Sequence, residues 1–274
     1  MNRNTQKSPF LVPLLVCLVI TVIMGGALLW LYRDDGGALP PDTSDSASDT
    51  TDKPDEKDPP EVAAVIFKTD LSAYEKYMDP ADRDAYLVLV NKTHTLTEGD
   101  KPSDLVSVKD ARKDISLRKT AEMALEAMFI EMRAAGFGDV FVTSAYRSYS
   151  YQTSLFNTYI DEEMAKDPSI GYAEAKERVL RYSAYPGTSE HQTGLCVDLM
   201  TDSMRELDES FADEPVYEWL LENAWKFGFV LRFPADKTDV TLYDFEPWHY
   251  RFVGRYHAYM IRRDGLCLEE YVGE

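Results

Sequence analysis

An uncharged segment at positions 10–32 most restricts what this chain of 274 residues can fold into. At ~1.5 Å rise per residue, a helix over this segment would be about 35 Å long, enough to cross a hydrocarbon core of roughly 30 Å. Arg3 and Lys7 precede the segment, whereas only Arg33 and then two aspartates follow it. The positive-inside rule therefore predicts that residues 1–33 form a cytoplasmic N-terminus and a single-pass transmembrane helix, with the rest of the chain extracellular.

The segment allows two other interpretations. A cleaved signal peptide is the main alternative, but the apolar run is long for one, and no small-x-small cleavage site clearly follows it. A lipoprotein signal around Cys17 is disfavoured because Val16 stands where a small residue is expected. We therefore expect an uncleaved anchor in the cell membrane.

Residues 34–61 are rich in Asp, Ser, Thr, Pro and Gly, and such a segment cannot bury enough apolar surface to fold. We interpret it as a disordered acidic linker, which leaves residues 62–274 as the extracellular domain. The formal net charge of −19 would repel nucleic acid phosphates. A nucleic acid partner is therefore not expected.

Helical and strand patterns alternate irregularly in the domain. Capping residues and apolar spacing predict helices over 118–135, with Gly136 as the C-cap, and over 150–165 and 215–227. Short apolar segments predict strands over 140–144, 195–200, 229–232 and 248–253. No regular strand–helix–strand repeat is visible, so the expected fold class is α+β, a small mixed sheet with flanking helices.

Two of the four histidines lie in short segments dense with polar and turn residues. The first segment runs from Ser189 to Asp198 and contains His191, and the second runs over 246–251 and contains His249. Gly194 permits a tight turn, after which strand alternation could direct Asp198 back toward His191.

Two imidazoles and one carboxylate are a common ligand set for catalytic zinc, because three protein ligands leave a position for water. Glu246, close to His249 and followed by a proline, is the natural candidate for a general base. Spacing alone leaves a structural role open for these histidines, since an isolated histidine more often serves as a hydrogen-bonding residue of the core or surface.

These segments also resemble a known family. The stretch Ser-x-His-x-x-Gly-x-x-x-Asp at 189–198, Glu-x-Trp-His at 246–249, and Ser-Ala-Tyr-Arg-Ser at 144–148 with Gln152 look like VanY-type D-alanyl-D-alanine carboxypeptidases. That family belongs to the LAS-type zinc metallopeptidases, which have a Hedgehog-like fold. The resemblance covers roughly residues 87–254.

The resemblance implies roles for individual residues. It implies that His191, Asp198 and His249 bind Zn²⁺, that Glu246 is the catalytic base, and that Arg147 holds a substrate carbonyl or carboxylate. Gln152 and Ser189 are weaker candidates, which could touch substrate or brace the ligand loops.

The chain departs from the family pattern at two positions. It has Cys196 where alanine is typical, and Thr95 where proline is frequent. A thiolate could be a fourth zinc ligand, but this would close the position that catalysis needs open, so Cys196 is interpreted as a small packing residue. A disulfide between Cys196 and Cys267 is allowed by the sequence but has no support in it.

The function implied is a zinc carboxypeptidase that removes a C-terminal D-alanine from peptidoglycan stem peptides. An L,D-carboxypeptidase or an endopeptidase with the same metal chemistry remains open, because specificity lies in the walls of the cleft. A non-catalytic cell-wall-binding module is a further alternative, disfavoured because the implied ligands, Glu246 and Arg147 are all present.

Overall fold

The computed structural model describes residue 62 and residues 64–274. The predicted anchor at 10–32 and linker at 34–61 lie outside the described residues. Within the described part of the chain, no helix is both long enough and apolar enough to span a membrane.

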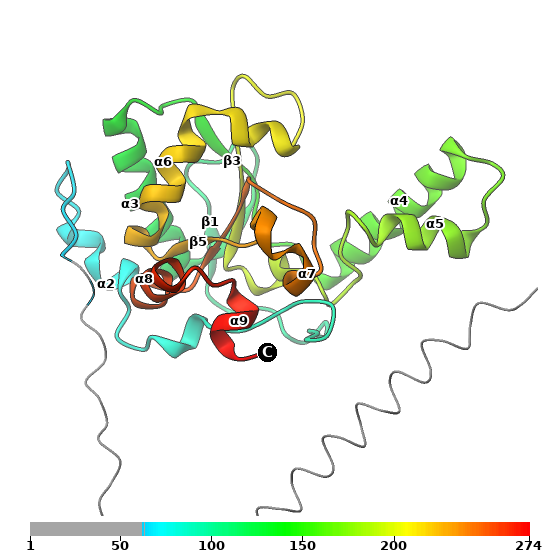
Figure 1. Ribbon diagram of the computed structural model, residues 1–274, viewed down its shortest axis with the longest axis horizontal. Helices are drawn as coiled ribbons and strands as arrows, with labels where there is room; N and C mark the ends of the chain where they lie inside the picture. The colour runs from blue at the N-terminus through cyan, green and yellow to red at the C-terminus, as the bar shows by residue number, and fades with distance from the viewer. Residues whose placement is uncertain (1–61, 63) are drawn as a thin grey trace, which may run out of the picture. The chain divides into compact units, whose positions relative to one another are not determined.

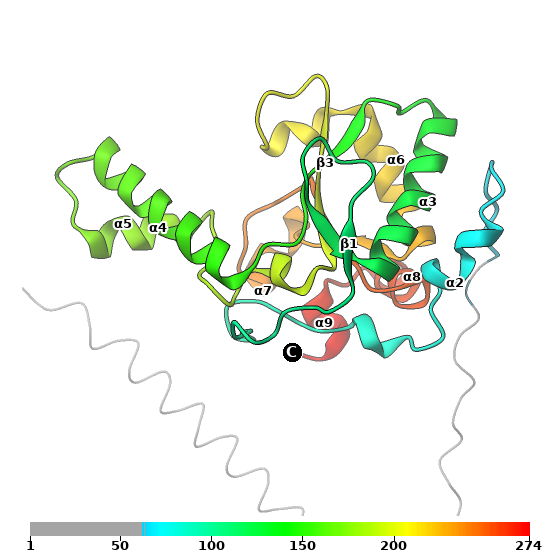
Figure 2. The ribbon, with the colours of Figure 1, turned by 180° about the vertical axis from the view of Figure 1, so that it is seen from behind.

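The described region contains two antiparallel sheets and eight α-helices (Figures 1 and 2). The strands are β1 (Leu105–Ser107), β2 (Ser116–Arg118), β3 (Val140–Ser144), β4 (Cys196–Thr201), β5 (Phe229–Leu231) and β6 (His249–Phe252). The helices are α2 (Glu75–Met78), α3 (Lys119–Ala135), α4 (Tyr149–Lys166), α5 (Tyr172–Val179), α6 (Pro215–Asn223), α7 (Thr238–Thr241), α8 (Arg255–Asp264) and α9 (Leu268–Val272).

Strands β1 and β2 form a hairpin, and the main sheet has the order β3-β4-β6-β5. The α+β class is confirmed, but the prediction of a mixed sheet is wrong, because every strand pair is antiparallel. One isolated parallel bridge, between Ala111 and Val142, is recorded within residues 64–274. The long connections between these strands allow either direction of pairing, so the sequence alone could not decide it.

One face of the main sheet packs on the principal hydrophobic core. Val197 and Leu199 of β4 and Tyr250 and Phe252 of β6 belong to the same buried cluster as the apolar side of α3. Because successive strand residues point to opposite faces, Cys196, Asp198 and their partners on β6 lie on the other face of the sheet. The core therefore supports a strand pair whose opposite side carries polar groups.

The helix boundaries follow local signals. Helix α3 ends at Gly136, whose φ of 104° is left-handed, as the predicted glycine C-cap requires. The predicted helix over 215–227 is an α-helix only to Asn223, and a 3-10 turn, Ala224–Phe227, completes it. Gly228 ends that turn with a left-handed φ of 85°. A Cβ at this position would lie 2.8 Å from the Phe252 ring, so glycine is needed here.

Helices α4 and α5 form a hairpin that projects from the body of the domain (Figures 1 and 2). It has a small core of its own, made by Phe156, Ile160, Ala175 and Val179. The side chain of Ser148 caps α4 by accepting a hydrogen bond from the Tyr151 N–H at 3.1 Å. The hairpin thus begins directly after Arg147.

Glu122 of α3 should make the stability of the domain depend on pH. It is 3% exposed, its Oε1 accepts the Lys109 N–H, and its Oε2 has no partner among the described residues. Burial raises its pKa to about 7 from 4.5. A carboxyl whose pKa is raised on folding stabilises the fold below about pH 4.5, and this contribution is lost as pH rises through 7.

We therefore expect thermal denaturation between pH 4.5 and 8 to show a loss of about 2 to 3 kcal/mol from this group. Glu122→Gln should flatten the profile in that window. Identical pH profiles for the variant and the wild type would contradict the assignment.

Candidate active site

The site is built on the face of β4 and β6 that points away from the hydrophobic core. Asp198 is paired with His249 across the two strands, and Cys196 is paired with Arg251. All four residues are at most 4% exposed. Two antiparallel strands therefore fix the carboxylate of Asp198 beside the imidazole of His249.

His191 reaches this face from the 3-10 turn η3 (Glu190–Thr193). Gly194 ends η3 with a φ of 63°, and a Cβ there would lie 3.0 Å from the Leu105 side chain, so glycine is needed at this turn. The His191 Nδ1 lies 2.6 Å from the Ala145 carbonyl oxygen, and its Nε2 lies 3.2 Å from Asp198 Oδ2. The hydrogen bond to Ala145 thus leaves Nε2 facing the carboxylate.

His249 presents its other nitrogen to the same carboxylate. Its Nδ1 lies 3.2 Å from Asp198 Oδ1 and 3.4 Å from Glu246 Oε2, and its Nε2 lies 3.1 Å from Glu190 Oε2. The two imidazole rings are perpendicular, with centroids 5.0 Å apart. The structure therefore brings together the three predicted metal ligands and the predicted base.

The electrostatics of this cluster suit a cation. Burial raises the pKa of Asp198, but the two imidazoles outweigh burial and hold it well below its usual range. Burial and Arg147 lower the pKa of His191, but Asp198 and Cys196 outweigh them and raise it to about 9. Asp198 Oδ1 is buried and has no hydrogen-bond partner among the described residues, although His249 is near. A divalent cation would satisfy that oxygen and replace the protons on the imidazoles.

Cys196 is fully buried and lies against both imidazoles. One donor atom each from His191, Cys196 and His249 lies within 4.8 Å of the others. Burial raises the pKa of the Cys196 thiol, but the two imidazoles outweigh burial and lower it. Cys196 and Cys267 are both free thiols, so they form no disulfide.

Arg147 lies beside His191, where its backbone and its guanidinium each donate one hydrogen bond. Its backbone N–H donates to the His191 carbonyl oxygen at 3.1 Å, and its Nη1 donates to Gln152 Oε1 at 3.0 Å. Gln152 is 1% exposed and donates in turn to the Ala184 carbonyl oxygen at 2.7 Å. The buried Nε of Arg147 has no partner within the described residues. Ser189 is buried next to η3, and its side chain does not cap that turn.

The sequence interpretation missed a buried ionic network behind His249. Glu190 Oε1 accepts hydrogen bonds from Arg232 Nε at 2.8 Å and Arg251 Nη1 at 2.6 Å, and Arg232 also makes two hydrogen bonds to Glu269. Burial raises the pKa of Glu190, but Arg251 and Arg232 outweigh burial and hold it well below its usual range. The ionised Glu190 therefore accepts the Nε2–H of His249 and directs Nδ1 toward Asp198.

The sequence pattern of the VanY family, described as D-alanyl-D-alanine carboxypeptidase, matches residues 114–255. The chain belongs to the VanY family. The match contains both histidines, Asp198, Glu246 and Arg147, so the whole cluster described above lies within it.

Relatives and solved VanY-like structures agree with this membership. The chain is 39% identical to a putative carboxypeptidase, YodJ, of Bacillus subtilis over 192 residues, covering 68% of this chain and 66% of the relative. The LdcB LD-carboxypeptidase structure superposes with a TM-score of 0.60 at 36% identity, covering 70% of this chain and 87% of that chain. A Zn(II) complex of a mutant vancomycin resistance D,D-pentapeptidase VanY, from a VanB-type resistance cassette, superposes with a TM-score of 0.58 at 35% identity, covering 69% and 99%. The matched regions span about half to two thirds of the length of the first curated relatives.

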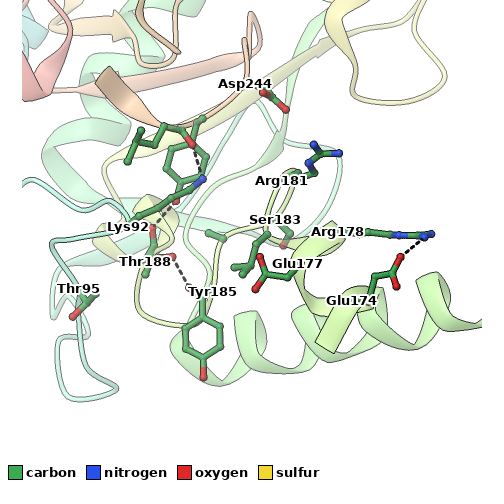
Figure 3. Close-up of a pocket in the computed structure, with 14 residues that line it drawn as sticks. Lys92, Thr95, Glu174, Glu177, Arg178, Arg181, Ser183, Tyr185, Thr188 and Asp244 are labelled. Carbon is green, nitrogen blue, oxygen red and sulfur yellow. Dashed lines mark hydrogen bonds and ion pairs between the residues drawn. The ribbon is translucent and has the colours of Figure 1, made fainter. Parts of the chain in front are cut away.

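This VanY-family domain has a large pocket lined by residues of α5, the loop after it and the segment 242–244 (Figure 3). The pocket has a volume of about 1110 Å³. The histidines do not line it, but Thr188 does, and Ser183 of its wall accepts a hydrogen bond from Gln152 at 3.4 Å. Its lining contains three basic residues and three acidic residues, which are Lys92, Arg178 and Arg181, and Glu174, Glu177 and Asp244.

We expect Glu190→Gln to weaken zinc binding by about 10- to 100-fold, because the residue orients His249. Loss of the buried charge should also destabilise the domain by ~3 to 5 kcal/mol. Glu269→Gln is the matched control, since Glu269 pairs with the same Arg232 but does not contact His249. Chelator competition and thermal denaturation measure the two effects separately. Equal zinc affinities for the two variants would contradict the orienting role of Glu190.

Proposed function

We propose that this protein is a zinc-dependent carboxypeptidase that removes a C-terminal D-alanine from peptidoglycan stem peptides. The observation that carries the proposal is that the buried imidazoles of His191 and His249 each lie 3.2 Å from an oxygen of the buried Asp198 carboxylate. Two imidazoles and a carboxylate suit a hydrolytic zinc ion. Family membership and the Zn(II) complex of the VanY relative support this choice of metal.

A bound zinc ion would lower the pKa of a water molecule and polarise the scissile carbonyl. Glu246 is partly exposed, with its carboxylate 3.4 Å from His249 Nδ1, so it can receive substrate and still reach the cluster. We assign to Glu246 the acceptance of a proton from the attacking water and its transfer to the departing amine.

Arg147 is proposed to bind the carbonyl or the terminal carboxylate of the substrate. Its guanidinium is held by Gln152 on one side and keeps the buried Nε free. A planar guanidinium can donate two parallel hydrogen bonds to such a group. Gln152 therefore positions Arg147, and the contacts of the described side chains give Ser189 no comparable role.

The pocket in Figure 3 is proposed to hold the residues of the stem peptide that precede the released D-alanine. It adjoins the site through Gln152, and it offers Lys92 and Arg181 to carboxylates and Glu177 and Asp244 to an amine. A stem peptide that carries both kinds of charge would match this lining.

The main alternative is an L,D-carboxypeptidase, which the likeness to LdcB favours. An endopeptidase uses the same metal chemistry, and a wall-binding module uses the same fold. The purified protein should be incubated with stem peptides that end in D-Ala-D-Ala or in a single D-Ala, and the products weighed by mass spectrometry. Release of D-alanine from either peptide supports a carboxypeptidase, and which of the two peptides is cut decides between D,D- and L,D-specificity. Binding without release contradicts the proposal.

We further propose that residues 10–32 anchor the chain in the cell membrane with the domain outside. The uncharged length of this segment and its flanking charges support the proposal. Protease added to intact protoplasts should remove the domain. Recovery of a mature form that lacks residues 1–32 would favour a cleaved signal peptide instead.

A further inference from the structure

Cys196 is buried among ligand candidates rather than in the hydrophobic core. It lies two residues before Asp198 on β4, so both side chains point to the same face of the sheet. Its partner on β6 is Arg251, and Asp198 beside it is paired with His249. Val197 and Leu199 point to the core on the opposite face. A packing role therefore does not account for a thiol at this position.

The thiol is close enough to both imidazoles to share a metal with them. One donor atom each from His191, Cys196 and His249 lies within 4.8 Å of the others. In a tetrahedral zinc site, with Zn–N of ~2.0 Å and Zn–S of ~2.3 Å, nitrogen and sulfur are about 3.5 Å apart. Small side-chain adjustments would therefore bring the three donors onto one ion.

Asp198 provides a second, independent indication. Its Oδ1 is buried, faces the same cluster and has no hydrogen-bond partner within the described residues. Asp198 is not among the three residues whose donor atoms lie within 4.8 Å of one another, but its carboxylate lies 3.2 Å from each imidazole, so it would add a fourth donor beside them. A set of four protein ligands is the number that a closed tetrahedral site uses.

We propose that Cys196 Sγ is a fourth metal ligand in the substrate-free enzyme. The proposal rests on the metal site of the proposed function and adds one ligand to it. On binding, the thiol releases its proton to solvent, and the sulfur occupies the position that hydrolysis needs open. Substrate must then displace the sulfur or the metal must become five-coordinate, and the site should prefer thiophilic cations.

Cobalt substitution tests the proposal without an activity assay. The protein loaded with Co²⁺ should show visible ligand-field bands and, in addition, a near-ultraviolet thiolate-to-cobalt charge-transfer band. Cys196→Ala and Cys196→Ser should lose the charge-transfer band and keep the visible bands. Cys267→Ala is the matched control, because Cys267 is also a buried free thiol, and it should keep both.

Metal affinity gives a second measurement. Chelator competition should show that Cys196→Ala binds Cd²⁺ at least about tenfold more weakly than the wild type and Cys267→Ala do. Cobalt bound by the wild type without a charge-transfer band would overturn the fourth ligand and leave the proposed function intact. Failure of the wild type to bind Co²⁺, Cd²⁺ or Zn²⁺ would instead overturn the metal site and the proposed function with it.

Discussion

Glu246→Gln should lower kcat for D-alanine release by about 10²- to 10⁴-fold, because an amide cannot accept the proton that a carboxylate base accepts. The variant should keep its zinc, since Glu246 is not one of the proposed ligands, and its affinity for the stem peptide should change little. Steady-state kinetics, elemental analysis and calorimetry measure these three properties.

Glu270→Gln is a suitable control for the change of charge, because Glu270 pairs with Lys237 and contacts neither histidine of the cluster. It should turn over peptide at the wild-type rate. If Glu246→Gln did the same, the proposed mechanism would be wrong. If Glu246→Gln lost its zinc, Glu246 would have to be reassigned as a ligand.

Arg147→Lys should lower kcat/KM by about 10²- to 10³-fold and leave the zinc content unchanged. A lysine ammonium cannot hold Gln152 and at the same time present a planar pair of donors to the substrate. The kinetics should be measured together with zinc content and thermal stability, so that a loss of fold is recognised.

Arg133→Lys on α3 is the matched control, since Arg133 pairs with Asp110 at a partly exposed position. It should have no effect on kcat/KM. Activity of Arg147→Lys within a few-fold of the wild type would show that a point charge suffices and that the planar arrangement is not needed.

Much of the fold could be predicted because its signals are local. The strand Val140–Ser144 has the predicted bounds, and α3 and α4 lie within one residue of theirs. Helix α8 was missed because its buried positions include Arg255 and His257, so the sequence lacks the apolar spacing expected of a packed helix. The direction of strand pairing was missed because it depends on contacts between distant segments.

In the site, too, residues of compact local motifs could be predicted, whereas contacts between distant segments could not. His191, Asp198, His249 and Glu246 could be named in advance because their motifs are compact and resemble those of the VanY family, and strand alternation related Asp198 to His191. Glu190 lies within a quoted motif, but its partner Arg232 is 42 residues away, so no spacing rule connects them. Cys196 was interpreted as a packing residue because a fourth protein ligand would close the position that hydrolysis needs open, and the sequence could not show that its thiol lies against both imidazoles.

The pairing of Arg232 with Glu269 has a consequence for how this family can diverge. The two residues are 37 positions apart, both are buried, and Arg232 also contacts the glutamate that orients His249. Replacing either residue alone leaves an unbalanced buried charge next to the site. Positions 232 and 269 should therefore covary across homologues, with one exchanged for a neutral residue only where the other is exchanged too.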